Sequence, residues 1–127
     1  MKLRFAVALA AALLVAVPQV AVAQHMDINT VINSIGGTKF LRDAGRADGA
    51  SGLRVVRLST LAGAEQNASR LWSAVELKAR DVQYLRSNLV LNPWAMSAIR
   101  GAGFGVRDIV AIDMAGDGGG VIYANDL

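Results

Sequence analysis

One line of apolar and small residues dominates the hydrophobic pattern of this chain. It recurs in steps of three and four from Leu61 to Leu89, and only Lys78 interrupts it. Such steps place side chains on one face of an α-helix, so we expect a single long helix from about Ala64 to Asn88. The line consists of Leu61, Ala64, Ala68, Leu71, Val75, Val82, Leu85 and Leu89.

Shorter patterns predict a second helix and three strands around the long helix. Asn92-Pro93 is typical of a helix start, with Asn as the N-cap and Pro at the first helical position, and this helix is expected to end near Gly101. The strands are expected at 53–59, 108–114 and 121–125, where β-branched residues are frequent. The Gly- and Asp-rich turn at 115–120 predicts that the last two strands form a hairpin.

The segment from 24 to 52 gives a weaker signal. Asp27 is a suitable cap for a short helix whose apolar side is Ile28, Val31, Ile32 and Ile35, and Gly36-Gly37 would end it. Residues 44–52 are small, polar and rich in glycine, which favours a flexible loop.

These elements predict a small single domain of the α+β class. The expected order is strand, long helix, short helix and β-hairpin, with the helices packed on one face of a three-stranded antiparallel or mixed sheet. The predicted organisation is a leader at 1–23, an N-terminal helix and Gly-rich loop at 24–52, and the α+β domain at 53–127.

The first 23 residues have the pattern of a secretory signal peptide. Lys2 and Arg4 precede an unbroken apolar run from Phe5 to Val17, and Ala21-Val22-Ala23 resembles a cleavage site. The run is shorter than the roughly 20 apolar residues that a membrane-spanning helix needs, so we expect no stable membrane span after cleavage, with a retained anchor as the alternative. A bacterial periplasmic or secreted protein, cleaved after Ala23, is the expected product.

Removal of the leader changes the interpretation of charge. The whole chain has a formal net charge of +3, but Lys2 and Arg4 contribute two of those charges, so the mature chain is nearly neutral. Its arginines are scattered, which gives little reason to expect nucleic-acid binding. The chain has no cysteine, which excludes disulfides, thiol nucleophiles and cysteine-bound metals.

Asp113 and Asp117 are the candidate metal ligands. They flank the predicted hairpin turn beside several glycines, and paired carboxylates suit a hard cation such as calcium. Ala115 occupies a position where an EF-hand loop has a ligand, and no Glu follows at the required spacing. Ordinary turn chemistry, in which Asp and Gly tolerate tight backbone geometry, is therefore the favoured interpretation.

Trp72, Trp94 and Tyr123 are the candidate interaction residues. If they are exposed and clustered, they would form a recognition surface, although aromatic residues at such spacing more often belong to a core. His25, the only histidine, lies near the start of the mature chain, where a solvated tail residue is expected.

Three functions follow in order of support. No catalytic motif is evident and no cofactor is expected, so a non-enzymatic module that binds an unknown protein partner or a second copy comes first. A small-ligand or metal-ion-binding protein that uses the Asp113–Asp117 turn comes second. A small hydrolase comes last, because no nucleophile is paired with a base.

Overall fold

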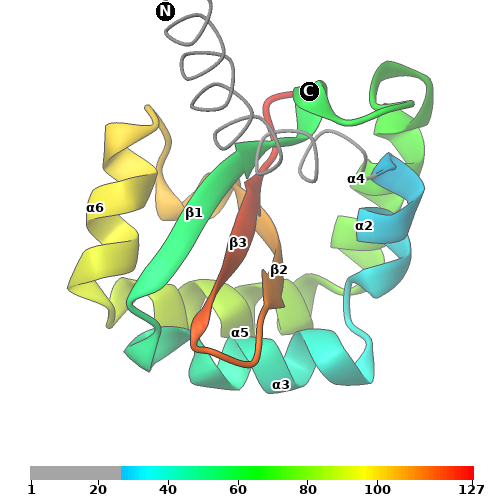
Figure 1. Cartoon of the computed structure of the whole chain (residues 1–127). Helices are drawn as coiled ribbons and strands as arrows, with labels where there is room; N and C mark the ends of the chain where they lie inside the picture. The colour runs from blue at the N-terminus through cyan, green and yellow to red at the C-terminus, as the bar shows by residue number, and fades with distance from the viewer. Residues whose placement is uncertain (1–26) are drawn as a thin grey trace, which may run out of the picture.

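The structure is a computed structural model that describes residues 27–127; the predicted leader and His25 lie outside this part of the chain. Its α+β class confirms the prediction, with five helices and a three-stranded sheet among the described residues (Figure 1). Four short 3-10 turns complete it, at Ala47–Gly49, Leu58–Thr60, Glu65–Asn67 and Val106–Asp108. The elements are α2 (Ile28–Ser34), α3 (Thr38–Arg46), β1 (Gly52–Arg57), α4 (Ala68–Leu77), α5 (Ala79–Val90), α6 (Pro93–Gly101), β2 (Ile109–Met114) and β3 (Gly119–Ala124).

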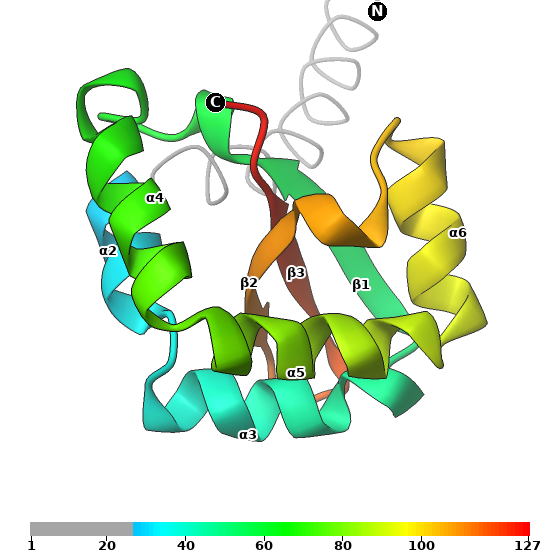
Figure 2. The same cartoon turned by 180° about the vertical axis from the view of Figure 1, so that it is seen from behind.

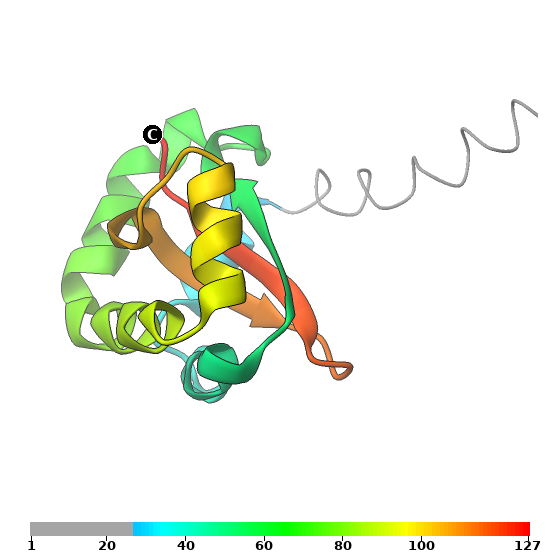
Figure 3. The ribbon, with the colours of Figure 1, turned by 90° about the vertical axis from the view of Figure 1, so that its left-hand side faces the viewer.

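The sheet is mixed and has the strand order β1-β3-β2. β2 and β3 form the expected antiparallel hairpin, with Ile112 opposite Ile122. β1 runs parallel to β3, with Val55 opposite Ile122. Between these two strands the chain passes through α4, α5, α6 and the outer strand β2, and β3 then lies between β1 and β2. The helices lie behind and around the sheet in Figure 1, and the side view in Figure 3 shows no described helix in front of it.

The predicted long helix is in fact two helices, α4 and α5, which meet at Lys78. The backbone of Lys78 leaves helical geometry, with φ −106° and ψ 29°. Its N–H still donates to the carbonyl of Ala74 at 2.9 Å, and the N–H of Val82 donates to the Lys78 carbonyl at 3.0 Å, so both backbone groups of Lys78 stay hydrogen-bonded at the bend. The one residue that interrupts the apolar line is thus the joint between the helices.

The bend at Lys78 lies against a second bend, between α2 and α3. Gly36 makes that second turn with a positive φ of 78°, and a Cβ built there would lie 2.7 Å from Cδ of Lys78. On either side of the two bends α2 packs against α4 and α3 against α5, as seen from behind in Figure 2. Arg70 of α4 also donates a hydrogen bond to Asn29 of α2.

The expectation of a flexible loop over 44–52 is wrong for most of that segment. Helix α3 continues to Arg46 and is followed at once by the turn at Ala47–Gly49. Ala44, Ala47 and Ala50 are buried in the same core as the rest of the described chain. Small side chains let this segment approach α5 closely, and their small size is why it resembles a loop in the sequence.

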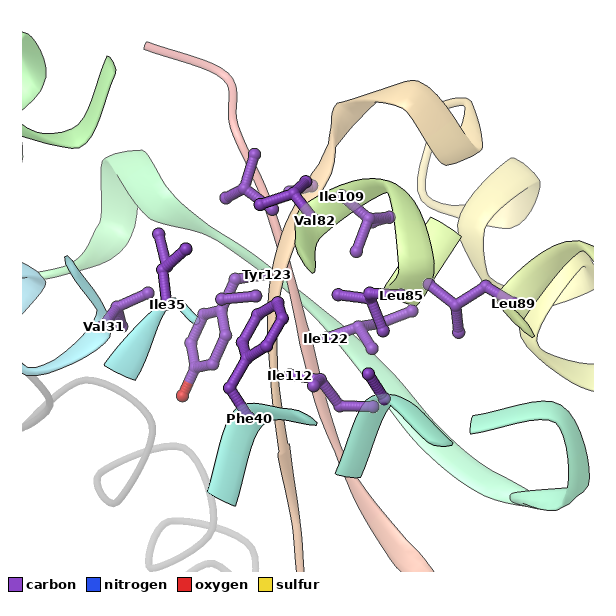
Figure 4. Close-up of a cluster of buried hydrophobic side chains, with 14 of the residues drawn as sticks. Val31, Ile35, Phe40, Val82, Leu85, Leu89, Ile109, Ile112, Ile122 and Tyr123 are labelled. Carbon is purple, nitrogen blue, oxygen red and sulfur yellow. The ribbon is translucent and has the colours of Figure 1, made fainter. Parts of the chain in front are cut away.

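A single hydrophobic core joins both helix pairs, α6 and the sheet. Figure 4 shows the side chain of Leu85 from α5 close to Ile122 of β3 and that of Leu89 farther along the same helix, with Phe40 of α3 beside Tyr123. None of the described helices is long and apolar enough to cross a membrane.

We predict that Leu71→Asp and Val82→Asp each abolish cooperative unfolding of the mature chain. Each side chain is 1% exposed, and an unpaired buried carboxylate costs a large part of a stability of about 5–15 kcal/mol. Urea denaturation followed by circular dichroism measures this.

Leu77→Asp is the matched control for Leu71→Asp, because Leu77 belongs to the same helix and is 81% exposed. Its free energy of unfolding should stay within about 0.5 kcal/mol of the wild type. A wild-type transition in Leu71→Asp would show that the apolar line is a surface.

Candidate functional site

Three large apolar residues are exposed where α5 meets α6. The exposed fractions are 54% for Val90, 68% for Leu91 and 70% for Trp94. Val90 is the last residue of α5, Leu91 lies in the connection, and Trp94 is in the first turn of α6. We call these three residues the apolar corner.

The side chain of Asn92 holds the apolar corner in place. It is 1% exposed, and its Oδ1 accepts hydrogen bonds from the main-chain N–H groups of Trp94 at 3.0 Å and Ala95 at 3.2 Å. Its Nδ2 donates to the carbonyls of Ala47 at 2.8 Å and Ala50 at 2.6 Å. Because an amide offers two donors and one oxygen with two lone pairs, every hydrogen-bonding position of Asn92 is used.

The predicted N-cap at Asn92 is therefore confirmed, and the residue does more than begin a helix. The sequence indicates the cap through Asn92-Pro93, but it does not reveal the partners of the amide nitrogen, which lie more than 40 residues earlier in the chain. The spacing of residues within one element does not predict contacts with residues so distant in the sequence.

The structure does not bring the three aromatic candidates together. Trp72 is 64% exposed on α4, whereas Trp94 is on α6, and these helices lie on opposite sides of the molecule in Figures 1 and 2. Tyr123 is buried on β3. Tyr123 is therefore a core residue, whereas Trp72 and Trp94 lie on the surface and do not form one cluster with it.

Tyr123 contributes to a hollow of about 250 Å³ between α2, α3 and the sheet. Burial is the main cause that raises the pKa of its hydroxyl, with a further contribution from Asp113 that Arg54 and Lys39 oppose. The hydroxyl is therefore protonated at neutral pH. The hollow is lined by Thr30, Val31, Ser34, Lys39, Phe40, Ile112, Asp113 and Tyr123.

Lys39 connects α3 to the end of β2 at the rim of this hollow. Its Nζ donates to Oδ2 of Asp43 at 2.6 Å, to Oδ1 of Asp113 at 2.7 Å and to the carbonyl of Met114 at 3.1 Å. Asp43 is buried and also accepts the N–H of Met114 at 3.1 Å. Burial alone would lower the pKa of Lys39, but its hydrogen bonds to Asp113 and Asp43 outweigh that effect and raise it.

The two candidate metal ligands lie on one hollow of about 540 Å³ beside the hairpin turn. Asp113 is held by Lys39, and Oδ1 of Asp117 accepts the N–H of Gly119 at 3.0 Å, next to Gly118 with a positive φ of 91°. This is the turn chemistry that the sequence favours. Within residues 27–127, no three side chains of the metal-binding types His, Cys, Asp and Glu lie close enough together to hold an ion.

Comparison with protein family models, with curated proteins and with solved structures found no match to this chain.

Sequence patterns miss Lys39 and Asp43 as a connected group, along with the exposure of Val90 and Leu91. The i,i+4 spacing of Lys39 and Asp43 was an available signal, because oppositely charged residues at that spacing meet on a helix. The signal is weak in the sequence, because the loop predicted at 44–52 begins directly after Asp43 and gives no reason to expect a helix there. Val90 and Leu91 lie off the apolar line of the helix, which was the available signal for their exposure.

We predict that Lys39→Met lowers the free energy of unfolding at pH 7 by about 1–3 kcal/mol, because the buried carboxylate of Asp43 loses its cation. The lower part of this range is expected, since the Lys39 side chain is 54% exposed and solvent screens the pair. The pKa of Lys39 is raised on folding, so its stabilisation is complete below the ordinary value of 10.5 and is lost as the pH rises through the folded value. Denaturation curves at neutral pH and above pH 10.5 should therefore show the two proteins converging.

The control for Lys39 is Lys78→Met, at the other lysine of residues 27–127, which is exposed and makes no ion pair among the described residues. An equal loss in both variants would contradict a specific contribution from the Asp43 pair.

We predict that Asn92→Asp lowers the free energy of unfolding by at least about 3 kcal/mol. Aspartate keeps the cap but turns a carboxylate oxygen toward the carbonyls of Ala47 and Ala50, which then lack a donor. Thermal and urea denaturation measure the change.

Asn88→Ala is the comparison for Asn92→Asp, because Asn88 makes one hydrogen bond, from Nδ2 to the carbonyl of Ala44. It should cost about 1 kcal/mol. Similar losses in the two variants would show that the fourfold hydrogen bonding of Asn92 is not important for stability.

Proposed function

We propose that this protein is a non-enzymatic, exported interaction module that binds a protein partner through the apolar corner. The observation that carries this proposal is the exposure of Val90, Leu91 and Trp94 on a turn that a fully hydrogen-bonded amide holds in place.

Exposure of a large apolar group is unfavourable unless a partner covers it. Burying apolar surface contributes about 25 cal/mol per Å², and tryptophan is among the residues that most often dominate binding energy at protein interfaces. Neighbouring exposed apolar side chains commonly mark such interfaces.

The rigidity of the corner supports binding as well. Ordering mobile side chains and loops reduces affinity, so a surface already fixed in the free protein binds more tightly. The hydrogen bonds of Asn92 fix the backbone on both sides of Pro93 before any partner arrives.

The positive charges near the apolar corner favour a different protein as the partner over a second copy of this chain. Arg86 and Arg107 lie next to Val90, so a twofold symmetric dimer through this corner would bring like charges together. The bend at Lys78 also interrupts the helix that would otherwise provide a long seam for pairing.

Export is part of the same proposal and is supported by the sequence of residues 1–23. We expect cleavage after Ala23 and a periplasmic or secreted mature protein. The partner would then be a protein of the same compartment.

We predict that Trp94→Ala abolishes partner binding while the domain stays folded. Tagged mature protein, incubated with an envelope fraction, should retain a specific protein in stoichiometric amounts, and the variant should lose it because the apolar anchor is gone. Mass spectrometry of the retained proteins, together with light scattering of the free module, measures this.

Trp72→Ala is the matched control, because Trp72 has a similar exposure on α4, away from the corner. It should retain the partner as the wild type does. Equal retention by Trp94→Ala and wild type, or a dimer that Trp94→Ala dissociates, would overturn the proposal of a heterologous partner at this corner.

A further inference from the structure

A hollow of about 370 Å³ lies between α5 and the turn at Val106–Asp108, next to the apolar corner. Val90 and Val106 give it apolar walls, and Arg86 and Arg107 bring two cations to it. Gln83 and Ser87 complete the lining.

Arg86 makes one hydrogen bond and no ion pair among the described residues. Its Nε donates to the carbonyl of Ile109 at 2.9 Å, which fixes the plane of the guanidinium. Among the described residues, no carboxylate lies within ion-pairing distance of its nitrogens, and its two terminal amino groups have no hydrogen-bond acceptor.

Arg86 is partly buried, which affects its electrostatics. Burial lowers the pKa of the guanidinium, and the nearby charge of Asp108 opposes this without cancelling it. Oδ2 of Asp108 accepts the N–H of Gly105 at 2.9 Å, so this carboxylate is hydrogen-bonded to the backbone and does not pair with Arg86. With Arg86, Arg107 and Asp108 together, the hollow keeps one excess positive charge.

These features match the chemistry of one ligand class. A guanidinium with a fixed plane and free amino groups suits a carboxylate, which accepts two parallel hydrogen bonds from it. The valine walls suit a short aliphatic stem behind that carboxylate.

We propose that this hollow is a binding site for a carboxylate carried on a short apolar stem, with Arg86 as the carboxylate ligand. The group would come either from the C-terminal residue of a polypeptide or from a free short-chain acid. The hollow shares Val90 with the apolar corner, but the proposal does not depend on Trp94, which does not line this hollow.

The test is a titration of the isotope-labelled mature protein, followed by NMR of the Arg86 Nε–H and the Val90 and Val106 methyl groups. The probes are 4-methylpentanoate, which represents a free acid, and N-acetylleucine, which represents a chain terminus. 4-Methylpentanamide is the matched control, because it has the same stem and no charge.

Saturable shifts at these three residues with a carboxylate probe, at least about tenfold tighter than with the amide, are the expected result. Tighter binding of N-acetylleucine would assign the site to a polypeptide end, and tighter binding of 4-methylpentanoate would assign it to a free acid. Equal shifts with acid and amide, or shifts only elsewhere, would overturn the proposal.

Arg86→Gln should weaken binding of the preferred acid at least about tenfold, and Arg107→Gln by less, because Arg107 is exposed and more fully hydrated. The comparison of acid with amide uses the wild-type chain, so it decides the question even if loss of the Ile109 contact unfolds Arg86→Gln. Trp94→Ala should bind the acid as the wild type does, which separates this site from the partner proposed for the corner.

Discussion

The side chain of Asn92 is the contact on which the arrangement of this domain most depends. A buried amide is costly unless all its groups are paired, and here four hydrogen bonds pair them. They join the start of α6 to the segment between α3 and β1, which is distant in sequence. These bonds contribute to the position of β1 relative to α6, two elements that also pack together directly, and they fix the backbone of the apolar corner.

Asp43 has a comparable role within α3. The two are the buried polar side chains of the described chain, and each links the helical layer to main-chain groups of a neighbouring element. Asp43 connects α3 to Met114 at the end of β2, while Asn92 fixes the chain just before β1. A cysteine-free domain of this size thus uses buried hydrogen bonds to fix the register between elements that hydrophobic packing alone would leave free to slide.

Much of the fold follows from local pattern. The apolar line, the Asn92-Pro93 start and the hairpin predict α4, α5, α6, β2 and β3 to within a few residues, because large apolar groups and special turn residues determine them. Helix α3 is missed because its second half and the turn after it consist of small and Gly-rich residues that resemble a loop, although the helix buries Phe40, Asp43 and Ala44. The bend at Lys78 is missed because one lysine in an otherwise regular apolar line does not predict a break, and the proximity of Lys78 to Gly36 spans more than 40 residues of chain. The candidate site is less predictable for the same reason, since exposure of Trp94 and isolation of Arg86 depend on which neighbours tertiary packing supplies.

The two ends of the described chain leave the fold side by side. Asp27 forms a bridge with Ala62, and the carboxylate of Asp126 accepts hydrogen bonds from the N–H of Ser59 at 2.9 Å and its hydroxyl at 2.6 Å. Both ends are thus fastened to one short stretch, residues 59–62, while the junction of α5 and α6 lies at the opposite end of the molecule in Figure 1. A surface, a fusion partner or a linker joined to either end would therefore attach to the domain at the end opposite Trp94. The exposed side chain of Trp94 would then remain accessible to a partner.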